Sequence, residues 1–359
     1  MRMKKLVIRL CFFIIPVMIY AGECVFVDAY NVFHVDNVRL TDITPNQNFI
    51  KTKYLLQNKG KFNALLLGSS RVANLPKEGL PEKTDDGREL NWYNMTYAMG
   101  SPSENYDTVK TLIDGGVKLD ELIILIDDIS MWKGVTKGLD NPIFTTYQTY
   151  EESPIRFYYS YLKLKPVWRI VPQIFFEYRL GENNEGKKLF YSYGVDVNNT
   201  NMEIGSAGDM PEPENSLEYD GGSGAVGAIK DLSELCKEQN IRLIVVTSPI
   251  LESTYEMAIS NGYLDFLYDV AQVTDYYLFS GINTYTVGPE YYFDASHFRP
   301  VVGLEMEKVM FGDEDVRNMA VEKAKNDMSL VEFGRLVTKE NAVDVIENLE
   351  QEINELNRK

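Results

Sequence analysis

The sequence predicts an α/β fold in which a parallel sheet lies between two layers of helices, preceded by a transmembrane helix. Short, unbroken apolar runs are typical of strands that are buried on both faces of a parallel sheet. Helix-like stretches alternate with these runs along much of the chain, as they do in α/β proteins. A basic and then apolar N-terminus precedes the alternation. The 359 residues can bury the core of one large domain or two smaller ones.

The N-terminal segment, residues 1–27, is expected to anchor the chain in a membrane. Basic residues within the first nine positions precede an apolar stretch at residues 10–21, which is the layout of a signal peptide or a signal anchor. Residues 6–22 could cross a bilayer if Arg9 reaches back to the cytoplasmic face. A poor cleavage site at residues 20–24 favours an anchor over a cleaved signal, and a buried helix is the alternative. The positive flank predicts a single-pass protein of the cell membrane whose main domain is extracytoplasmic.

A connector at residues 28–60 leads into an α/β domain at residues 61–312. The first strand is expected at residues 63–67, where the apolar run ends in a Gly-Ser-Ser turn. A helix at 109–117 and a strand at 121–126 follow. Residues 140–225 break the alternation and are rich in Tyr, Pro, Asn and Gly, so we expect an insertion there that could act as a lid. The insertion carries a helical patch at 155–180 and an acidic loop at 205–224.

The alternation returns after the insertion. We expect a helix at 225–239, a strand at 241–246, a helix at 255–272 and a weak strand at 276–279. Pro300 suits the first turn of a helix that runs to residue 310. Residues 313–359 are expected to form a helical tail, with helices at 316–326 and 342–358. The second of these has a loose apolar stripe that could pack on the domain or on a partner.

Composition excludes several classes of function. The 36 basic and 53 acidic residues give a net charge of −17, and no basic cluster follows the first residues, so no nucleic-acid partner is expected. The three cysteines have neither zinc-site nor disulfide-framework spacing, and no cluster of metal ligands is evident, so neither a metal nor another cofactor is expected. Only His34 and His297 could supply an imidazole base, and His34 lies just beyond the anchor.

Polar residues at the ends of the expected strands form the candidate site, because open parallel sheets bind ligands beyond the carboxyl ends of their strands. The first turn carries Ser69 and Ser70, and free backbone amides there could bind an oxyanion; a serine cap is the alternative. Asp294 precedes His297 by three residues. It could therefore hold Nδ1 of the imidazole and leave Nε2 to accept a proton from a serine. A surface histidine capped by an aspartate is the alternative.

These residues resemble the conserved blocks of the SGNH/GDSL hydrolase superfamily. The first block of that superfamily, a strand followed by Gly-x-Ser, is matched by Gly68-Ser69-Ser70, and the last, Asp-x-x-His, by Asp294 and His297. The resemblance implies a flavodoxin-like three-layer sandwich in which Ser70 is the nucleophile. Ser69 is the alternative nucleophile if the register is wrong by one residue.

The resemblance also implies an oxyanion hole. Gly100 fits the glycine of the second block, so its amide would join that of Ser70 as a donor. The third block, Gly-x-Asn-Asp, departs from the family, because the strand end here carries Asp127 and Asp128 and no Asn. An ionised carboxylate cannot donate a hydrogen bond, and the loss of one oxyanion donor costs about 10²- to 10³-fold in rate. The two aspartates could instead cap the turn or bind a cationic group of a partner.

The anchor and the altered third block narrow the resemblance to membrane-tethered proteins of cell-envelope polymer modification. Such proteins include the D-alanyl-teichoic-acid DltD family and the alginate O-acetylation proteins. The resemblance implies an extracytoplasmic esterase or acyltransferase that forms an acyl-enzyme on Ser70. Its partners would be a cell-surface glycan or glycopolymer and a membrane-bound O-acyltransferase. The alternative is a non-catalytic scaffold of the same fold that binds a glycan or the acyltransferase.

Two expectations concern substrate binding. Arg71 follows the proposed nucleophile and could orient an anionic or hydroxylated acceptor, with Ser69, Asp127 and Asp128 as further candidates; a surface ion pair is the alternative. The aromatic residues of the insertion, from Tyr147 to Trp168, could stack on sugar rings, although core packing is the more common role of such residues.

Overall fold

The computed structural model of the chain describes residues 2–28, 32–34, 46–131, 146–163, 184–206, 208–213, 217–221, 224–312 and 332–356. The chain divides into two compact units. One comprises Met1–Tyr54 and Thr136–Lys188, and the other comprises Leu55–Val135 and Leu189–Lys359. Helices α2 (Gln47–Gln57) and α7 (Asn184–Ser192) run across the boundaries between these ranges.

The second unit is built on a mostly parallel sheet. Within the described residues its strand order is β2-β1-β3-β4-β5-β6, and only β6 is antiparallel to its neighbour. Every residue of β1 and β3 is buried, as their unbroken apolar runs predict. The strands are β1 (Ala64–Leu67), β2 (Trp92–Asn94), β3 (Glu121–Ile126), β4 (Arg242–Thr247), β5 (Tyr276–Leu278) and β6 (Arg335–Val337).

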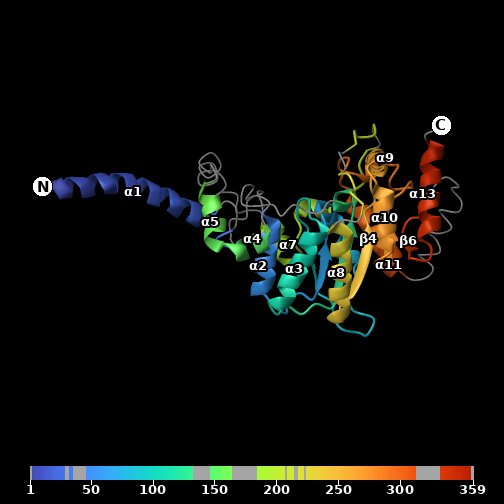
Figure 1. Cartoon of the computed structure of the whole chain (residues 1–359), viewed down its shortest axis with the longest axis horizontal. Helices are drawn as coiled ribbons and strands as arrows, with labels where there is room; N and C mark the ends of the chain where they lie inside the picture. The colour runs from blue at the N-terminus through green and yellow to red at the C-terminus, as the bar shows by residue number, and fades with distance from the viewer. Residues whose placement is uncertain are drawn as a thin grey trace. The chain divides into compact units, whose positions relative to one another are not determined.

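Helices cover both faces of this sheet. On one face, Leu66, Ile123 and Leu125 pack in a common core with side chains of α11 (Pro300–Phe311). Side chains alternate along a strand, so the equally buried Leu65 and Ile124 point to the other face. There α3 packs beside α8, and α8 packs against β4 and beside α10 (Figure 1). These helices are α3 (Pro102–Asp114), α8 (Gly224–Glu238) and α10 (Tyr263–Ala271).

Two helices differ from their expected extents for local reasons. The helix expected at 109–117 begins earlier, because Ser101 and Glu104 form a capping box at the start of α3. The helix expected at 255–272 is two helices, α9 (Glu252–Ser260) and α10. Gly262 separates them with a φ of 91°, a left-handed conformation that glycine adopts without strain.

The C-terminal residues belong to the sheet unit and do not form a purely helical tail. Strand β6 pairs with β5, and α13 (Ala342–Leu356) packs against α10. The apolar stripe expected on this last helix includes Val345 and Leu349, which are both 1% exposed, so it packs on the domain. The helix expected at 316–326 lies outside the described residues.

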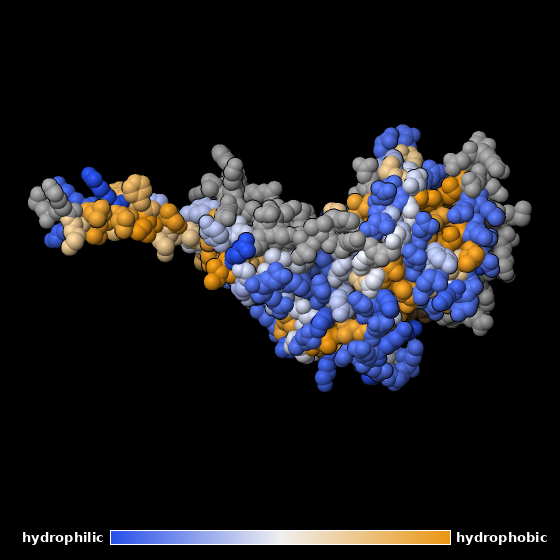
Figure 2. All heavy atoms as spheres, viewed as in Figure 1, coloured by the Kyte–Doolittle hydropathy of each residue, from blue (hydrophilic) through white to orange (hydrophobic). Residues whose placement is uncertain are grey.

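The first unit contains the N-terminal helix α1 (Arg2–Val27). The segment Met3–Phe26 is long and apolar enough to span a membrane. Its apolar residues are not buried in the protein, which disagrees with the alternative of a buried N-terminal helix (Figure 2). The Tyr20 hydroxyl contacts the Leu162 carbonyl oxygen in α5 (Pro154–Lys163), at 3.4 Å.

Several aromatic residues of the insertion pack around the Phe49 ring, whereas Tyr159 is 55% exposed. Tyr147, Tyr150 and Phe157 surround the Phe49 ring, with centroid distances of 5.8, 5.2 and 4.5 Å. Helix α4 (Tyr147–Glu152) and α5 supply them. The expected helical patch at 155–180 is described only to Lys163, so Trp168 lies outside the described residues. The described parts of residues 201–221 contain no helix or strand.

Candidate active site

The turn after β1 gives its two serines different environments. Gly68 has a φ of 146°, and a Cβ there would lie 2.7 Å from the Leu125 carbonyl oxygen, so the turn requires glycine. Ser69 is fully buried and caps the 3₁₀ helix η1 (Ser70–Asn74). Its Oγ accepts from the Arg71 amide at 3.3 Å and donates to Asp127 Oδ2 at 2.6 Å. Ser69 is therefore held inside the protein and does not face His297.

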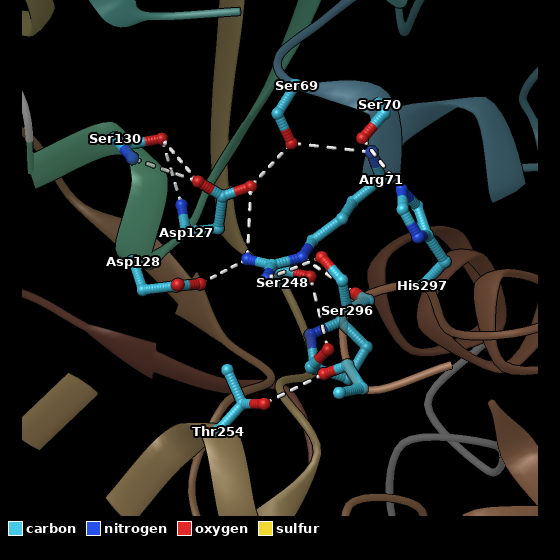
Figure 3. A network of polar contacts seen from close by, with 12 residues as sticks. Ser69, Ser70, Arg71, Asp127, Asp128, Ser130, Ser248, Thr254, Ser296 and His297 are labelled. Atoms are coloured by element: carbon cyan, nitrogen blue, oxygen red, sulfur yellow. Dashed lines mark hydrogen bonds and ion pairs between the residues drawn. The ribbon is translucent and has the colours of Figure 1, made fainter. Parts of the chain in front are cut away.

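Ser70 is the serine that meets the histidine. Its Oγ lies 2.8 Å from Nε2 of His297 (Figure 3). Nδ1 of the same ring lies 3.0 Å from each carboxylate oxygen of Asp294. The three residues expected to be catalytic thus form one continuous chain of hydrogen-bonding distances. In the tautomer that carries its proton on Nδ1, Nε2 is free to accept the proton of Ser70.

A short loop holds Asp294 and His297 together. Tyr292 and Phe298 pair as an antiparallel bridge, and the Phe293 amide donates to the His297 carbonyl oxygen at 2.8 Å. The Asp294 carboxylate accepts from the backbone amides of Ser296 and His297, both at 2.8 Å. The aspartate and the histidine are therefore oriented within one turn of chain.

Electrostatics keep the aspartate charged. Partial burial raises the pKa of Asp294, but hydrogen bonds from the His297 ring and from two backbone amides outweigh burial and lower it to about 2. The pKa lies below its ordinary value of 3.8, so ionised Asp294 stabilises the folded loop above about pH 4. That stabilisation is lost as the pH falls toward 2.

The backbone amides expected to hold an oxyanion lie on adjoining loops. A Cβ on Gly100 would lie 2.3 Å from the Gly68 carbonyl oxygen, so the two backbones are in close contact. The Thr96 hydroxyl, in the same loop, donates to the Ser69 carbonyl oxygen at 3.1 Å. Within the described part of the chain, no hydrogen bond is recorded from the amide of Ser70 or Gly100. Ser70 is partly buried and Gly100 is buried.

The residues expected to bind substrate are placed differently. Arg71, Asp127 and Asp128 are 0% exposed, like Ser69, so none of the four can contact a ligand from solution. This corrects the expectation that Arg71 orients an acceptor. These side chains can be buried because the Arg71 guanidinium forms ion pairs with both aspartates.

Asp127 takes the capping role that was one of its two expected alternatives. Its Oδ1 accepts from the amide and hydroxyl of Ser130, at 2.9 and 3.0 Å, at the start of the 3₁₀ helix η3 (Asp128–Met131). Burial raises the pKa of Asp128, and Asp127 raises it further, against the lowering effect of Arg71. Neither side chain is a donor that replaces the missing asparagine amide.

Two residues that support the site were not foreseen. Ser296 binds the Arg71 guanidinium, and the Thr254 hydroxyl donates to the Ala295 carbonyl oxygen at 2.9 Å. Both tether the loop that carries His297 (Figure 3). Nothing in the local sequence distinguishes them, because their partners, Arg71 and Ala295, are distant in the sequence. Among the residues that the structure describes, no group of three or more His, Cys, Asp or Glu side chains gathers as a metal site.

No protein-family model matches this chain, and no curated protein matches its sequence.

Asp294→Asn is expected to slow the reaction of Ser70 with a fluorophosphonate by about 10³- to 10⁴-fold at neutral pH. An amide cannot stabilise the imidazolium that forms during attack, nor does it select the Nδ1–H tautomer as a carboxylate does. The rate of adduct formation, followed by mass spectrometry, measures the effect. Asp231→Asn, on the exposed face of α8, is the matched control and should react like the wild type. If Asp294→Asn reacts at the wild-type rate, Asp294 has no part in activating Ser70.

Proposed function

We propose that this protein is a serine esterase or acyltransferase of the SGNH/GDSL type that works outside the cytoplasm on a cell-surface glycan or glycopolymer. The observation that carries the proposal is the chain of contacts from Ser70 Oγ through the His297 ring to the Asp294 carboxylate, at 2.8 and 3.0 Å. A serine activated by a histidine, with a third group that orients the histidine, is the arrangement of covalent acyl transfer.

The mechanism follows from the geometry. His297 Nε2 takes the proton of Ser70 while Oγ attacks the carbonyl carbon of an ester. The amides of Ser70 and Gly100 stabilise the negative charge on the carbonyl oxygen. His297 then gives its proton to the departing alcohol, which leaves an acyl group on Ser70. Water or a sugar hydroxyl, deprotonated in turn by His297, attacks this acyl-enzyme and releases an acid or a new ester.

The position of the site within the fold supports the proposal. The five parallel strands have the order 2-1-3-4-5, which is the order of flavodoxin-like sheets and of the fold that the family resemblance implies. In such sheets, ligands bind beyond the carboxyl ends of the strands, where the strand order reverses. Here the order reverses between β1 and β3. Ser70 follows β1 directly, and Asp127 and Asp128 follow β3.

The exposure of the site supports a large substrate. The side chains of Asp294 and His297 are 57% and 33% exposed, so an ester on a polymer can reach Ser70 without entering a closed chamber. Phe293 and Met99, which precede Asp294 and Gly100, are 43% and 40% exposed. Exposed apolar side chains beside a triad could contact an acyl chain or a sugar ring. The apolar helix α1 would keep this activity at the membrane, near a membrane-bound O-acyltransferase that could supply the acyl group.

One observation favours the second candidate, a non-catalytic scaffold that binds a glycan or the acyltransferase. At the end of β3, the Asp127 carboxylate contacts Ser130, Ser69 and Arg71. An aspartate also has no side-chain amide, so this position supplies no donor to an oxyanion. Retention of the contact between Ser70 and His297 favours catalysis.

An acetyl-transfer assay separates these functions. The full chain in detergent is incubated with p-nitrophenyl acetate and a panel of neutral, N-acetylated and uronic-acid oligosaccharides, and both nitrophenol and acetylated sugar are measured. Acetylated sugar that is absent with Ser70→Ala would establish a transferase. Turnover to nitrophenol that depends on Ser70, with no acetylated sugar, would establish an esterase. If neither product depends on Ser70 in the folded protein, the enzymatic proposal is wrong and the scaffold remains.

A further inference from the structure

We propose that Arg71 is a positioning residue, which fixes the loop of His297 against the turn of Ser70, and that Asp127 and Asp128 are the counter-charges that hold Arg71 in place. This inference rests on the proposed function, because it assigns these residues a part in setting the nucleophile and the base of one reaction. Arg71 would act through its neighbours and not by touching the substrate.

Arg71 joins three segments of the chain that are far apart in the sequence. The residue itself follows β1. Its Nη1 forms ion pairs with Asp128 Oδ1 and, at 3.3 Å, with Asp127 Oδ2, both after β3. Its Nε donates to the Ser296 carbonyl oxygen at 2.7 Å, and its Nη2 donates to the Ser296 hydroxyl at 3.0 Å, in the loop that follows β5 (Figure 3). Every nitrogen of the guanidinium is therefore engaged.

The guanidinium joins the neighbours of the two reacting groups. Arg71 directly follows Ser70, and Ser296 directly precedes His297. The contact between Asp294 and His297 lies within one loop and does not depend on this bridge. The contact between Ser70 and His297 joins segments 227 residues apart, so its length depends on how the two segments are tethered. A misplacement of about 1 Å between reacting groups can cost about 10²-fold in rate.

Burial explains why two aspartates lie at the end of β3. A guanidinium with no exposure is costly unless charge and hydrogen bonds compensate it. A neutral asparagine at both positions would leave this cation without a counter-charge. The planar fork of arginine can bind Ser296 and the aspartates at once, whereas the single ammonium of lysine cannot span both.

The test uses the full chain in detergent and two readouts. The first is the rate at which a fluorophosphonate modifies Ser70. The second is the ¹⁵N spectrum of the histidine rings, which is simple because the chain has only His34 and His297, and His34→Ala assigns them. The variants are Arg71→Lys and the milder Ser296→Ala. The control is Arg242→Lys, which alters an ion pair with Glu121 at the start of β3, the opposite end of the strand from the site.

We expect Arg71→Lys to lower the modification rate by about 10²-fold and Ser296→Ala to lower it by about threefold or more. In Arg71→Lys, the Nε2 signal of His297 should move toward that of a ring without a serine partner, while the Nδ1–H signal that reports Asp294 stays. Arg242→Lys should change neither readout. A purely structural role would lower the unfolding temperature without moving the Nε2 signal.

The proposal is overturned if both variants, folded by their circular dichroism, keep the wild-type rate and the wild-type Nε2 signal. It is also overturned if Arg71→Lys unfolds while Ser296→Ala keeps both wild-type values, because Arg71 would then serve stability alone. If wild-type Ser70 fails to react but the Nε2 signal still moves in Arg71→Lys, the positioning role stands and the proposed function fails.

Discussion

Ser70→Ala will lower the reaction with fluorophosphonate and with p-nitrophenyl acetate by about 10⁴-fold or more, because it removes the atom that attacks. The temperature of unfolding should stay that of the wild type, since the recorded side-chain hydrogen bond of Ser70 is its contact with His297. Ser70 is only partly buried, so its loss leaves no cavity in the core. Ester hydrolysis and thermal unfolding, measured on the same preparation, check both statements.

Ser69→Ala is the matched control for Ser70→Ala and should show the opposite pattern. Ser69 Oγ is buried, donates to Asp127 and caps η1, so its loss should reduce the free energy of unfolding by about 1–3 kcal/mol. The chemistry at Ser70 should remain within about tenfold of the wild type, since the cost of one hydrogen bond bounds the effect. If Ser69→Ala abolished the reaction and Ser70→Ala left it intact, the register of the nucleophile would be wrong.

Gly100→Ala is expected to impair both activity and stability. A Cβ at this position would lie 2.3 Å from the Gly68 carbonyl oxygen and 2.9 Å from the Tyr97 ring, and a backbone carbonyl cannot move aside cheaply. The two loops must separate, which should displace the Gly100 amide and lower the rate of ester attack by about 10²- to 10³-fold. Overpacking should also reduce the free energy of unfolding by about 1–3 kcal/mol.

Gly227→Ala is the control for this substitution. A Cβ at Gly227, within α8, would meet no atom within 4 Å, so alanine should leave activity unchanged and keep or raise stability. Kinetics with p-nitrophenyl acetate and denaturant unfolding compare the two variants. A Gly100→Ala enzyme with wild-type kinetics would show that the amide of Gly100 has no part in stabilising the oxyanion.

Strands could be predicted from the sequence where their apolar runs are long. All residues of β1 and β3 and the last four residues of β4 are buried, and the apolar runs predict these strands to within a residue or two. Strands β2 and β6 have three residues each and carry no such signal. Pairing with a distant neighbour makes them strands, and local sequence does not encode that pairing. For the same reason the sequence did not predict that β6, which lies beyond the expected domain end at residue 312, joins the sheet.

In the site, too, contacts within one loop could be predicted from the sequence, and contacts between distant segments could not. Asp294 and His297 interact within one loop, so their spacing alone predicted their contact. The cap at Asp127 and Ser130 is likewise local. The burial of Arg71 could not be predicted, because arginine is almost never fully buried unless it is paired. Its partners are Asp127 and Asp128, after β3, and Ser296, in the loop of His297, and they meet Arg71 only in the folded protein.

The most direct test of the central claim, that His297 activates Ser70 as a nucleophile, is to map the adduct of a fluorophosphonate. The full chain, folded in detergent, is treated with the probe, digested and sequenced by mass spectrometry, beside His297→Ala. We expect one adduct, on Ser70, that is lost in His297→Ala. Folded protein with no adduct on Ser70, or with an adduct on Ser70 that His297→Ala does not diminish, would contradict the claim.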